Sequence, residues 1–297
     1  MTRHDVDRAA DRSFGVDVDD GGGIIDATAA STHRPWPVPA RRWAMAMTWH
    51  DLLFLHWPVA PASLEAFIPP PLRLDTFDGR AWLGVVPFRM SGIRLRGLPP
   101  IPGTAAFPEI NVRTYAVAPD GRTGVWFFSL DATSRLAVRA ARAWFGLPYF
   151  DARIEVDAYD AGDVAGTGVA GLGGRGDVAA IRYGSTRTHH GAPSATFAGC
   201  YRPTGPASLA APGTLDHWLT ERYALFSVDR RGRVGCGEID HAQWPLQPAA
   251  VDVARNTMAE PIGIALPEPA PLAHFARRLD VAAWTVRPLD EGERRGR

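Results

Sequence analysis

The sequence predicts an α+β domain built mainly from antiparallel β-strands, with a few flanking helices. Short runs of apolar and β-branched residues recur along the chain and are bounded by turn-forming residues, which is typical of strands. Two Asp-Gly pairs, Asp78-Gly79 and Asp120-Gly121, stand between such runs, and this pair favours tight hairpin turns. One segment, from Ser134 to Gly146, combines a helical apolar spacing with signals that begin and end a helix.

We expect one domain over residues 41–287, with a disordered tail at each end. Residues 1–40 are rich in Asp, Gly, Ala and Thr, lack an apolar period and end in a proline-spaced run. Residues 288–297 are charged and contain glycine, which predicts a frayed end. Of the 297 residues, 46% are hydrophobic, which is ample for one large core.

The first part of the domain is predicted to consist of paired strands. Residues 43–57 are mostly apolar and predict a buried strand or strand pair. The Asp-Gly pairs predict one hairpin that joins 72–74 to 81–88 and another that joins 109–117 to 124–130.

A helix is expected to follow, capped at its start by Ser134 and ended by Gly146 and Pro148. Its exposed face carries several arginines, among them Arg142. A solvated face is the simplest interpretation of these charges, and a role for Arg142 toward a pocket is the alternative. The remaining predicted elements are a helix over 214–223 and strands over 224–228, 233–239 and 279–286.

The basic residues exclude one class of chemistry. All 32 of them are arginine, and the chain contains no lysine. A guanidinium stays protonated at any working pH, whereas a buried lysine can lose its proton and attack a carbonyl. The chain therefore cannot form a Schiff base through a lysine side chain.

Composition also bounds the partners and the compartment. Formal net charge is zero and there is no dense basic run, so we expect no nucleic acid partner. Cys200 and Cys236 are too few for a disulfide framework, which fits a reducing compartment. The acidic N-terminus has no leader-like apolar segment, and no apolar run is long enough to span a bilayer. We expect a cytoplasmic protein with no membrane partner.

Residues 109–115 form a strand with one polar face. Alternation puts Glu109, Asn111, Arg113 and Tyr115 on that face and apolar residues on the other. One interpretation is a face exposed to water, as in many antiparallel sheets. The other is a strand that lines a polar cavity, where the carboxylate acts as a general base or orients a ligand.

Metal and cofactor chemistry is not expected, although the chain has nine histidines. His189 and His190 are adjacent and would point to opposite faces of a strand, and His50 and His56 lack the spacing of a helical ligand pair. His241 stands near Trp244 and acidic groups at a chain reversal. It either borders a pocket or belongs to a structural turn anchored by the tryptophan.

Several phrases of the sequence stand out together: LLFLHWP (52–58), FDGRAWLGVVPF (77–88), FPEINVRTY (107–115), FFSLDA (127–132), LPY (147–149), TERY (220–223), IDH (239–241) and WPL (244–246). Over about residues 43–286, these phrases resemble the YqjF-like proteins of the DUF2071 group. One departure is Thr48, where a glutamine is expected in the opening phrase.

That group is in turn similar to the acetoacetate decarboxylase superfamily, which implies a β-cone or barrel around an apolar pocket. The resemblance implies that Glu109 faces inward and that Arg142 belongs to the site. It also aligns Tyr149 and Phe150 with the paired lysines of the decarboxylases. Because neither residue supplies an amine, the resemblance implies the fold and not the decarboxylation.

Three functional hypotheses remain. In the first, the chain binds an organic acid or carbonyl compound in an internal pocket, and Asn111, Arg113, Tyr115 and Arg142 hold the ligand. In the second, it is an enzyme for enolisation, hydration or lactone chemistry that uses Glu109 as general base and Tyr149 or His241 as acid. In the third, it is a scaffold that presents an interaction surface. A homo-oligomer is expected from the superfamily resemblance alone.

Overall fold

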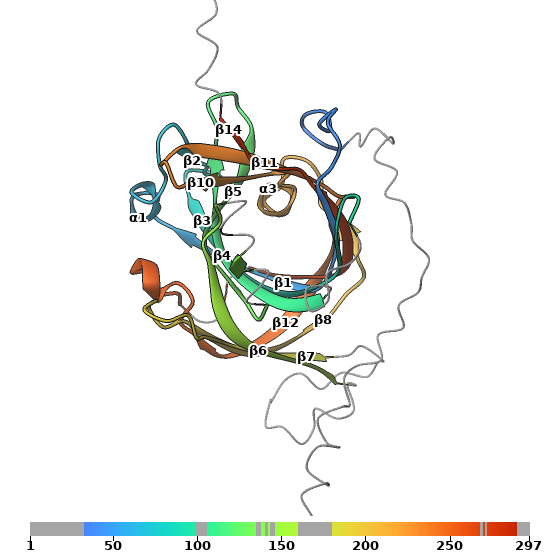
Figure 1. The fold of residues 1–297 in the computed structure, drawn as a ribbon. Helices are drawn as coiled ribbons and strands as arrows, with labels where there is room; N and C mark the ends of the chain where they lie inside the picture. Colours follow the sequence, from blue (N-terminus) through green and yellow to red (C-terminus); the bar gives the residue numbers. More distant parts are fainter. Residues whose placement is uncertain are drawn as a thin grey trace, which may run out of the picture.

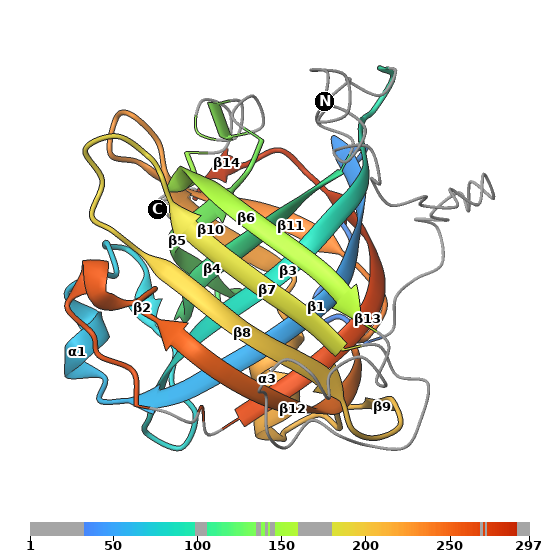
Figure 2. The same cartoon turned by 90° about the horizontal axis from the view of Figure 1, so that it is seen from below.

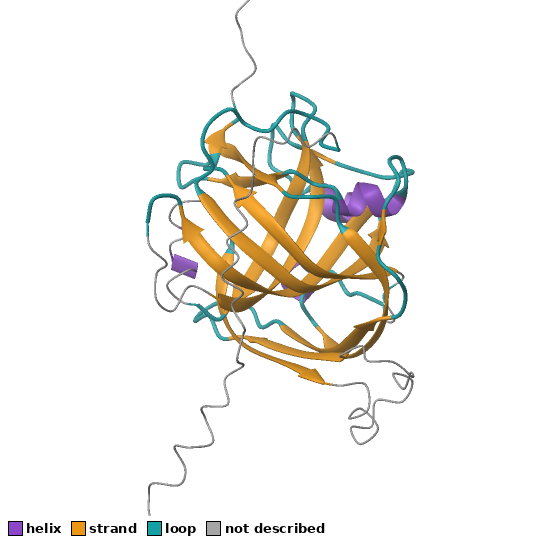
Figure 3. Ribbon diagram, turned by 90° about the vertical axis from the view of Figure 1, so that its right-hand side faces the viewer, coloured by secondary structure: helices purple, strands orange, loops and turns teal. Residues whose placement is uncertain are grey.

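The computed structural model describes residues 33–98, 106–134, 138–139, 142, 146–159, 180–267, 270 and 272–289. Strands make up the body of the protein, and the described helices are short (Figure 3). In chain order the elements are β1 (Met45–Val59), α1 (Ala62–Glu65), β2 (Arg73–Leu74), β3 (Ala81–Leu95), β4 (Ala106–Val117), β5 (Thr123–Ala132), β6 (Tyr149–Tyr159), β7 (Ala180–Arg187), β8 (Thr196–Pro203), β9 (Ser208–Leu209), α3 (Leu215–Thr220), β10 (Ala224–Val228), β11 (Val234–Asp240), β12 (Pro245–Asn256), η2 (Glu260–Ile262), β13 (Leu272–Ala283) and β14 (Arg287–Pro288).

The described strands close into two rings that share β13, β1, β3, β4 and β5. A ring of nine strands runs β5-β6-β7-β8-β12-β13-β1-β3-β4 and is closed by the pairing of β4 with β5. A ring of seven strands runs β11-β10-β5-β4-β3-β1-β13 and is closed by the pairing of β11 with β13. Figure 1 looks into the seven-strand ring, and α3 lies at its inner side. The prediction of a mainly antiparallel barrel with a few helices is confirmed.

The two rings enclose different side chains. The nine-strand ring is filled by an apolar core between β1, β3 and β4 and the layer of β6, β7, β8 and β12, which crosses in front of them in Figure 2. Leu53, Ile110 and Tyr183 belong to this core. The side chains on the opposite face of β1, β3 and β4, such as Phe54 and Phe88, belong to a second cluster inside the seven-strand ring. Each shared strand therefore presents one face to each ring.

Gly124 allows the seven-strand ring to close. β5 pairs in parallel with β10 at this point, and a Cβ added to Gly124 would lie only 2.7 Å from the carbonyl oxygen of Ala224. No side chain fits at that distance from backbone. A glycine is therefore needed where β5, which stays paired with β4 along one edge, accepts β10 along its other edge.

The two Asp-Gly turns have different outcomes. Asp120-Gly121 joins β4 to β5, which pair in antiparallel fashion as predicted. Asp78-Gly79 also forms a tight turn, with both residues at positive φ, and Phe77 pairs with Arg80 across it. The hairpin predicted between 72–74 and 81–88 is wrong, because β2 pairs with β4. Two residues of strand are too few to hold a hairpin against a longer neighbour.

Of the two predicted helices, the second is described in full and the first only in part. The helix predicted over 214–223 is present but shorter: α3 covers Leu215–Thr220, and the hydroxyl of Thr214 caps it by accepting from the backbone N–H of His217. Of the helix predicted from Ser134, residues 138, 139 and 142 are helical, and the N–H of Val138 donates to the carbonyl of Ser134. The other residues of that helix lie outside the described ones. The last long strand, β13, begins seven residues before the predicted 279–286.

The chain is ordered against the barrel before residue 41. Arg34 is 8% exposed and its guanidinium lies 3.0 Å from Asp240 Oδ1 and 3.7 Å from Glu238 Oε2. The same guanidinium stacks 4.8 Å from the ring of Tyr223, and the indole of Trp36 donates to Glu238. The prediction of disorder over residues 1–32 and 290–297 concerns residues outside the described ones.

Among the described residues, no helix is long and apolar enough to cross a membrane.

Candidate functional site

The polar face of β4 lies inside the seven-strand ring. Glu109 is 2% exposed, Asn111 is 4% exposed and Tyr115 is fully buried, whereas Arg113 is partly buried. The interpretation of this face as solvent-exposed is therefore wrong. Burying four polar side chains in a row is costly unless they bond to each other or to a ligand.

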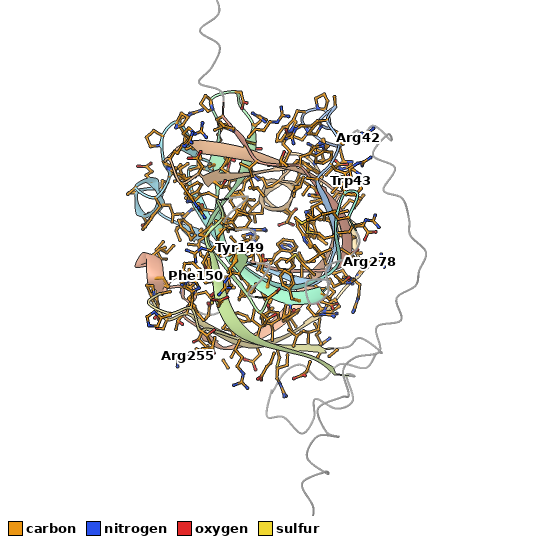
Figure 4. All side chains as sticks on the ribbon, in the orientation of Figure 1. Arg42, Trp43, Tyr149, Phe150, Arg255 and Arg278 are labelled. Atoms are coloured by element: carbon orange, nitrogen blue, oxygen red, sulfur yellow. The ribbon has the colours of Figure 1, made fainter. Side chains whose placement is uncertain are left out.

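Glu109 is paired with Tyr149, the first residue of β6. The Tyr149 hydroxyl donates to Glu109 Oε2 over 2.9 Å, and both side chains come together because β6 begins parallel to the end of β5. Figure 4 shows Tyr149 beside the centre of the ring. Burial raises the pKa of Glu109 to about 8, against the hydrogen bonds from Tyr149 and Asn111, which lower it. Glu109 is thus mostly protonated at neutral pH.

Tyr149 itself remains a phenol. Burial first, and then the neighbouring Glu109, raise its pKa well above the usual value. At neutral pH the Glu109 carboxyl group and the Tyr149 phenol are therefore both protonated and uncharged. Of these two groups, only the Glu109 carboxyl group titrates near physiological pH.

Arg113 brings a positive charge to the same face. Its guanidinium stacks 5.3 Å from the centre of the Phe54 ring, and its Nε has no hydrogen-bond partner among the described residues. Within the same residues no carboxylate lies within ion-pair distance of it, while other buried arginines have one, as Arg187 has Asp131 and Arg222 has Asp75. A guanidinium with no carboxylate beside it can pair with an anion.

His56 lies close to Arg113. Its Nε2 lies 2.7 Å from the Tyr115 hydroxyl. Burial, and then the charge of Arg113, lower the pKa of His56 well below its usual range, so the ring is neutral. Gly84 leaves room for both side chains, since a Cβ added there would lie 3.1 Å from His56 Nε2 and 3.3 Å from Arg113 Cγ.

An aromatic wall faces these polar groups. The rings of Trp49 and Trp244 stack with their centres 5.8 Å apart, and Phe54 meets Trp244 edge-on at 4.9 Å. The ring of Phe88 packs edge-on against Trp49, with the ring centres 5.9 Å apart. Both indole N–H groups are buried and lack a partner among the described residues, as do Asn111 Oδ1 and His56 Nδ1. Such unpaired groups mark positions where a bound molecule or water would bond.

His241 adjoins this wall without reaching Glu109. It stacks 4.6 Å from Tyr223 and packs 5.3 Å from Trp244. Its Nδ1 donates to the carbonyl of Ala242, and burial lowers its pKa. A neutral ring whose only proton is held by a carbonyl is poorly placed to act as an acid.

Arg142 lies outside the ring. Its side chain is exposed, and NH1 donates to the carbonyl of Tyr149 and to His189 Nε2, each over 3.1 Å. The hydrogen-bond partners of the Arg142 side chain in the described structure thus do not include Glu109, and its place in a common site stays a prediction. Arg142 instead lines a separate cavity.

The histidines do not converge in the described part of the chain. No group of three or more His, Cys, Asp or Glu that could hold a metal is found there. His50 bonds to Ser91, His56 to Tyr115 and His189 to Arg142. From the sequence, His56 was weighed only as a possible metal ligand, and its place beside Arg113 was not predicted. Its place two residues after Phe54 in one strand was the available signal, but the pairing of β1 with β3 and β4 was needed to use it.

A sequence profile of the DUF2071 family, whose members are described as uncharacterized conserved proteins, matches residues 46–280. The chain belongs to the DUF2071 family. It is 42% identical over 250 residues to the uncharacterized protein YqjF of Bacillus subtilis (strain 168), a match that covers 84% of this chain and 94% of YqjF.

Solved structures extend the likeness of this DUF2071 protein to a wider fold. An acetoacetate decarboxylase-like enzyme from Sphingomonas wittichii RW1 is 15% identical with a TM-score of 0.54, covering 84% of this chain and 94% of that one. The enduracididine biosynthesis enzyme MppR, complexed with pyruvate, is 12% identical with a TM-score of 0.54, covering 89% and 99%. Acetoacetate decarboxylase from Legionella pneumophila is 10% identical with a TM-score of 0.51, covering 87% and 93%.

These structures establish that the DUF2071 chain shares the acetoacetate decarboxylase-like fold. Both the family and the fold that the sequence motifs implied are confirmed.

Proposed function

We propose that this protein binds a small carboxylic acid inside the seven-strand ring, with Arg113 as the anchor for the carboxylate. The observation that carries the proposal is the inward-facing Arg113 guanidinium, which has no counter-ion among the described residues. A carboxylate is its natural partner because the two groups match in charge and geometry.

The rest of the face suits the same ligand. Glu109, protonated at neutral pH, adds no negative charge and presents a carboxyl group that can donate to a carboxylate or carbonyl oxygen. Asn111 and the indoles of Trp49 and Trp244 add polar atoms that lack partners in the described structure. The aromatic rings offer an apolar surface for the organic part. MppR, which has a similar fold, is complexed with pyruvate, so a 2-oxo acid is the first class to test.

Pyruvate is expected to raise the melting temperature of the protein in a thermal-shift assay. At a hundred times its Kd, a ligand stabilises the folded state by about 2.7 kcal/mol. Arg113→Met should abolish the shift, and the methyl ester of pyruvate, which lacks the charge, should produce none. The shift should also shrink above pH 8, where Glu109 ionises and repels the carboxylate.

A matched control is Arg153→Met, which removes an arginine with a 77% exposed side chain from the outer layer. It should leave the shift intact. A shift that survives Arg113→Met, or the absence of any shift with pyruvate, 3-oxo acids and hydroxy acids, would contradict binding at Arg113.

The pKa of Glu109 favours a second candidate, an enzyme that moves a proton on its bound acid. When ionised, the Glu109 carboxylate can accept a proton from the carbon next to a carbonyl, leaving an enolate whose charge faces Arg113. The same proton then returns, or is replaced from solvent. A carboxylate with a pKa of about 8 is a stronger base than an ordinary one.

In deuterium oxide, the protein is expected to speed the exchange of the pyruvate methyl protons, measured by NMR. The rate should rise as Glu109 ionises toward pH 8, and Glu109→Gln should remove the effect while pyruvate still binds. If binding is seen and exchange in the wild type equals exchange in Glu109→Gln, the protein binds its ligand without this catalysis.

A further inference from the structure

A cavity lies away from the polar face of β4. Its volume is about 550 Å³, and it is formed by the segment before β6, the turn between β10 and β11, and the end of the described chain near β14. It contains Arg142 and none of the polar residues of β4. It is therefore distinct from the site around Arg113.

Close backbone packing builds the walls of this cavity. Gly146 adopts φ 63°, and a Cβ added there would lie 2.7 Å from the carbonyl oxygen of Val228. A Cβ added to Gly235 would lie 2.6 Å from Val286 Cγ1. The two glycines hold the three segments against each other, so the cavity is a product of the packed fold and not of one loop.

The cavity is strongly basic. Among the described residues, Arg142, Arg230 and Arg233 line it together with one acidic residue, Asp229. The Asp229 carboxylate is already saturated: it accepts from the backbone N–H groups of Arg231 and Arg233 and pairs with the Arg233 guanidinium at 2.8 Å. In the described part of the chain, Arg230 has no carboxylate within ion-pair distance. Positive charge is thus in excess, in a chain whose net charge is zero.

Part of the cavity lining is apolar. Leu147 is 8% exposed and lines it beside Val228 and Val286. An apolar surface with arginines around it fits a molecule that has an anionic group at one end and a planar or apolar body at the other.

We propose that this cavity binds a phosphate ester whose organic part is planar or apolar. A phosphate suits three guanidinium groups better than a carboxylate does, because it carries up to two negative charges and three acceptor oxygens. Arg142 would contact such a ligand while its NH1 stays bonded to the Tyr149 carbonyl, so the ligand would sit directly behind the residue that pairs with Glu109.

The test uses p-nitrophenyl phosphate as the probe and isothermal titration calorimetry on the full chain. The wild type should bind p-nitrophenyl phosphate. It should bind inorganic phosphate and p-nitrophenol more weakly, because the first lacks the aromatic ring and the second lacks the phosphate. Arg230→Ala and Arg142→Ala should each weaken binding about tenfold or more, the effect of removing a charge-assisted contact.

Arg231→Ala is the matched control. Arg231 belongs to the same turn but does not line the cavity, and its removal should leave the affinity unchanged. Saturating pyruvate should not displace the probe. The proposal is overturned if Arg231→Ala weakens binding as much as Arg230→Ala, if both cavity variants bind like the wild type, or if pyruvate competes with the probe.

Discussion

Replacing Glu109 with glutamine is expected to raise the free energy of unfolding by about 3 kcal/mol at pH 7. The physical reason is the raised pKa. In the unfolded chain Glu109 has an ordinary pKa near 4.5, and in the folded protein its pKa is about 8. Between these values the folded protein must hold a proton that the unfolded chain has released. The glutamine amide occupies the same space and still accepts from Tyr149, but it does not require the proton.

The pH dependence gives this prediction its sign. Because the folded state binds more protons, wild-type stability falls as pH rises from about 4.5 to about 8, by up to about 1.4 kcal/mol per pH unit from this group. Below pH 4.5 both states are protonated and the advantage of the glutamine should vanish. Urea unfolding of both proteins at several pH values measures the difference.

Glu65 provides the control for this experiment. It is exposed in α1, so Glu65→Gln removes the same carboxyl group without relieving a buried charge, and unfolding free energies should stay within about 0.5 kcal/mol. A gain from Glu109→Gln that is equal at all pH values would show that the pKa of Glu109 in the folded protein is the same as in the unfolded chain, and would contradict the prediction.

Replacing Arg187 with methionine is expected to lower the free energy of unfolding by about 3–5 kcal/mol. Arg187 and Asp131 form a two-pronged ion pair, with Nε–Oδ1 and NH2–Oδ2 distances of 2.6 and 2.8 Å. Their side chains are 2% and 1% exposed. The pair joins β5 to β7, and the Arg187 guanidinium also stacks 4.1 Å from the ring of Phe150. Without the arginine, Asp131 is left buried with no positive partner.

Two further variants separate the ion pair from the packing. Arg187→Met combined with Asp131→Leu removes both charges and should recover most of the loss, since apolar residues can replace a buried pair at little cost. The exposed pair of Arg153 and Glu155 is the control, and Arg153→Met should cost about 0–1 kcal/mol. If the double variant is less stable than Arg187→Met alone, packing on Phe150, and not charge, determines the effect.

Local signals predicted the turns and caps but not all of the strand partners. Asp120-Gly121 and Thr214 do what their residue types favour, because the relevant energies arise within a few neighbouring residues. Asp78-Gly79 also turns the chain, yet the segments 72–74 and 81–88 on either side of it do not pair with each other. Partner choice depends on contacts between distant segments, which a local pattern does not contain.

By itself, the sequence determined that no lysine chemistry is available, that the chain has a DUF2071 barrel, and that Glu109, Asn111, Arg113 and Tyr115 share one face. Only the tertiary structure decided which way that face points. Strand alternation has the same period whether the polar side meets water or the inside of a ring. Closure of the seven-strand ring turned the face inward, brought Tyr149 to Glu109 and left Arg142 outside, because these placements depend on pairing between strands far apart in the chain.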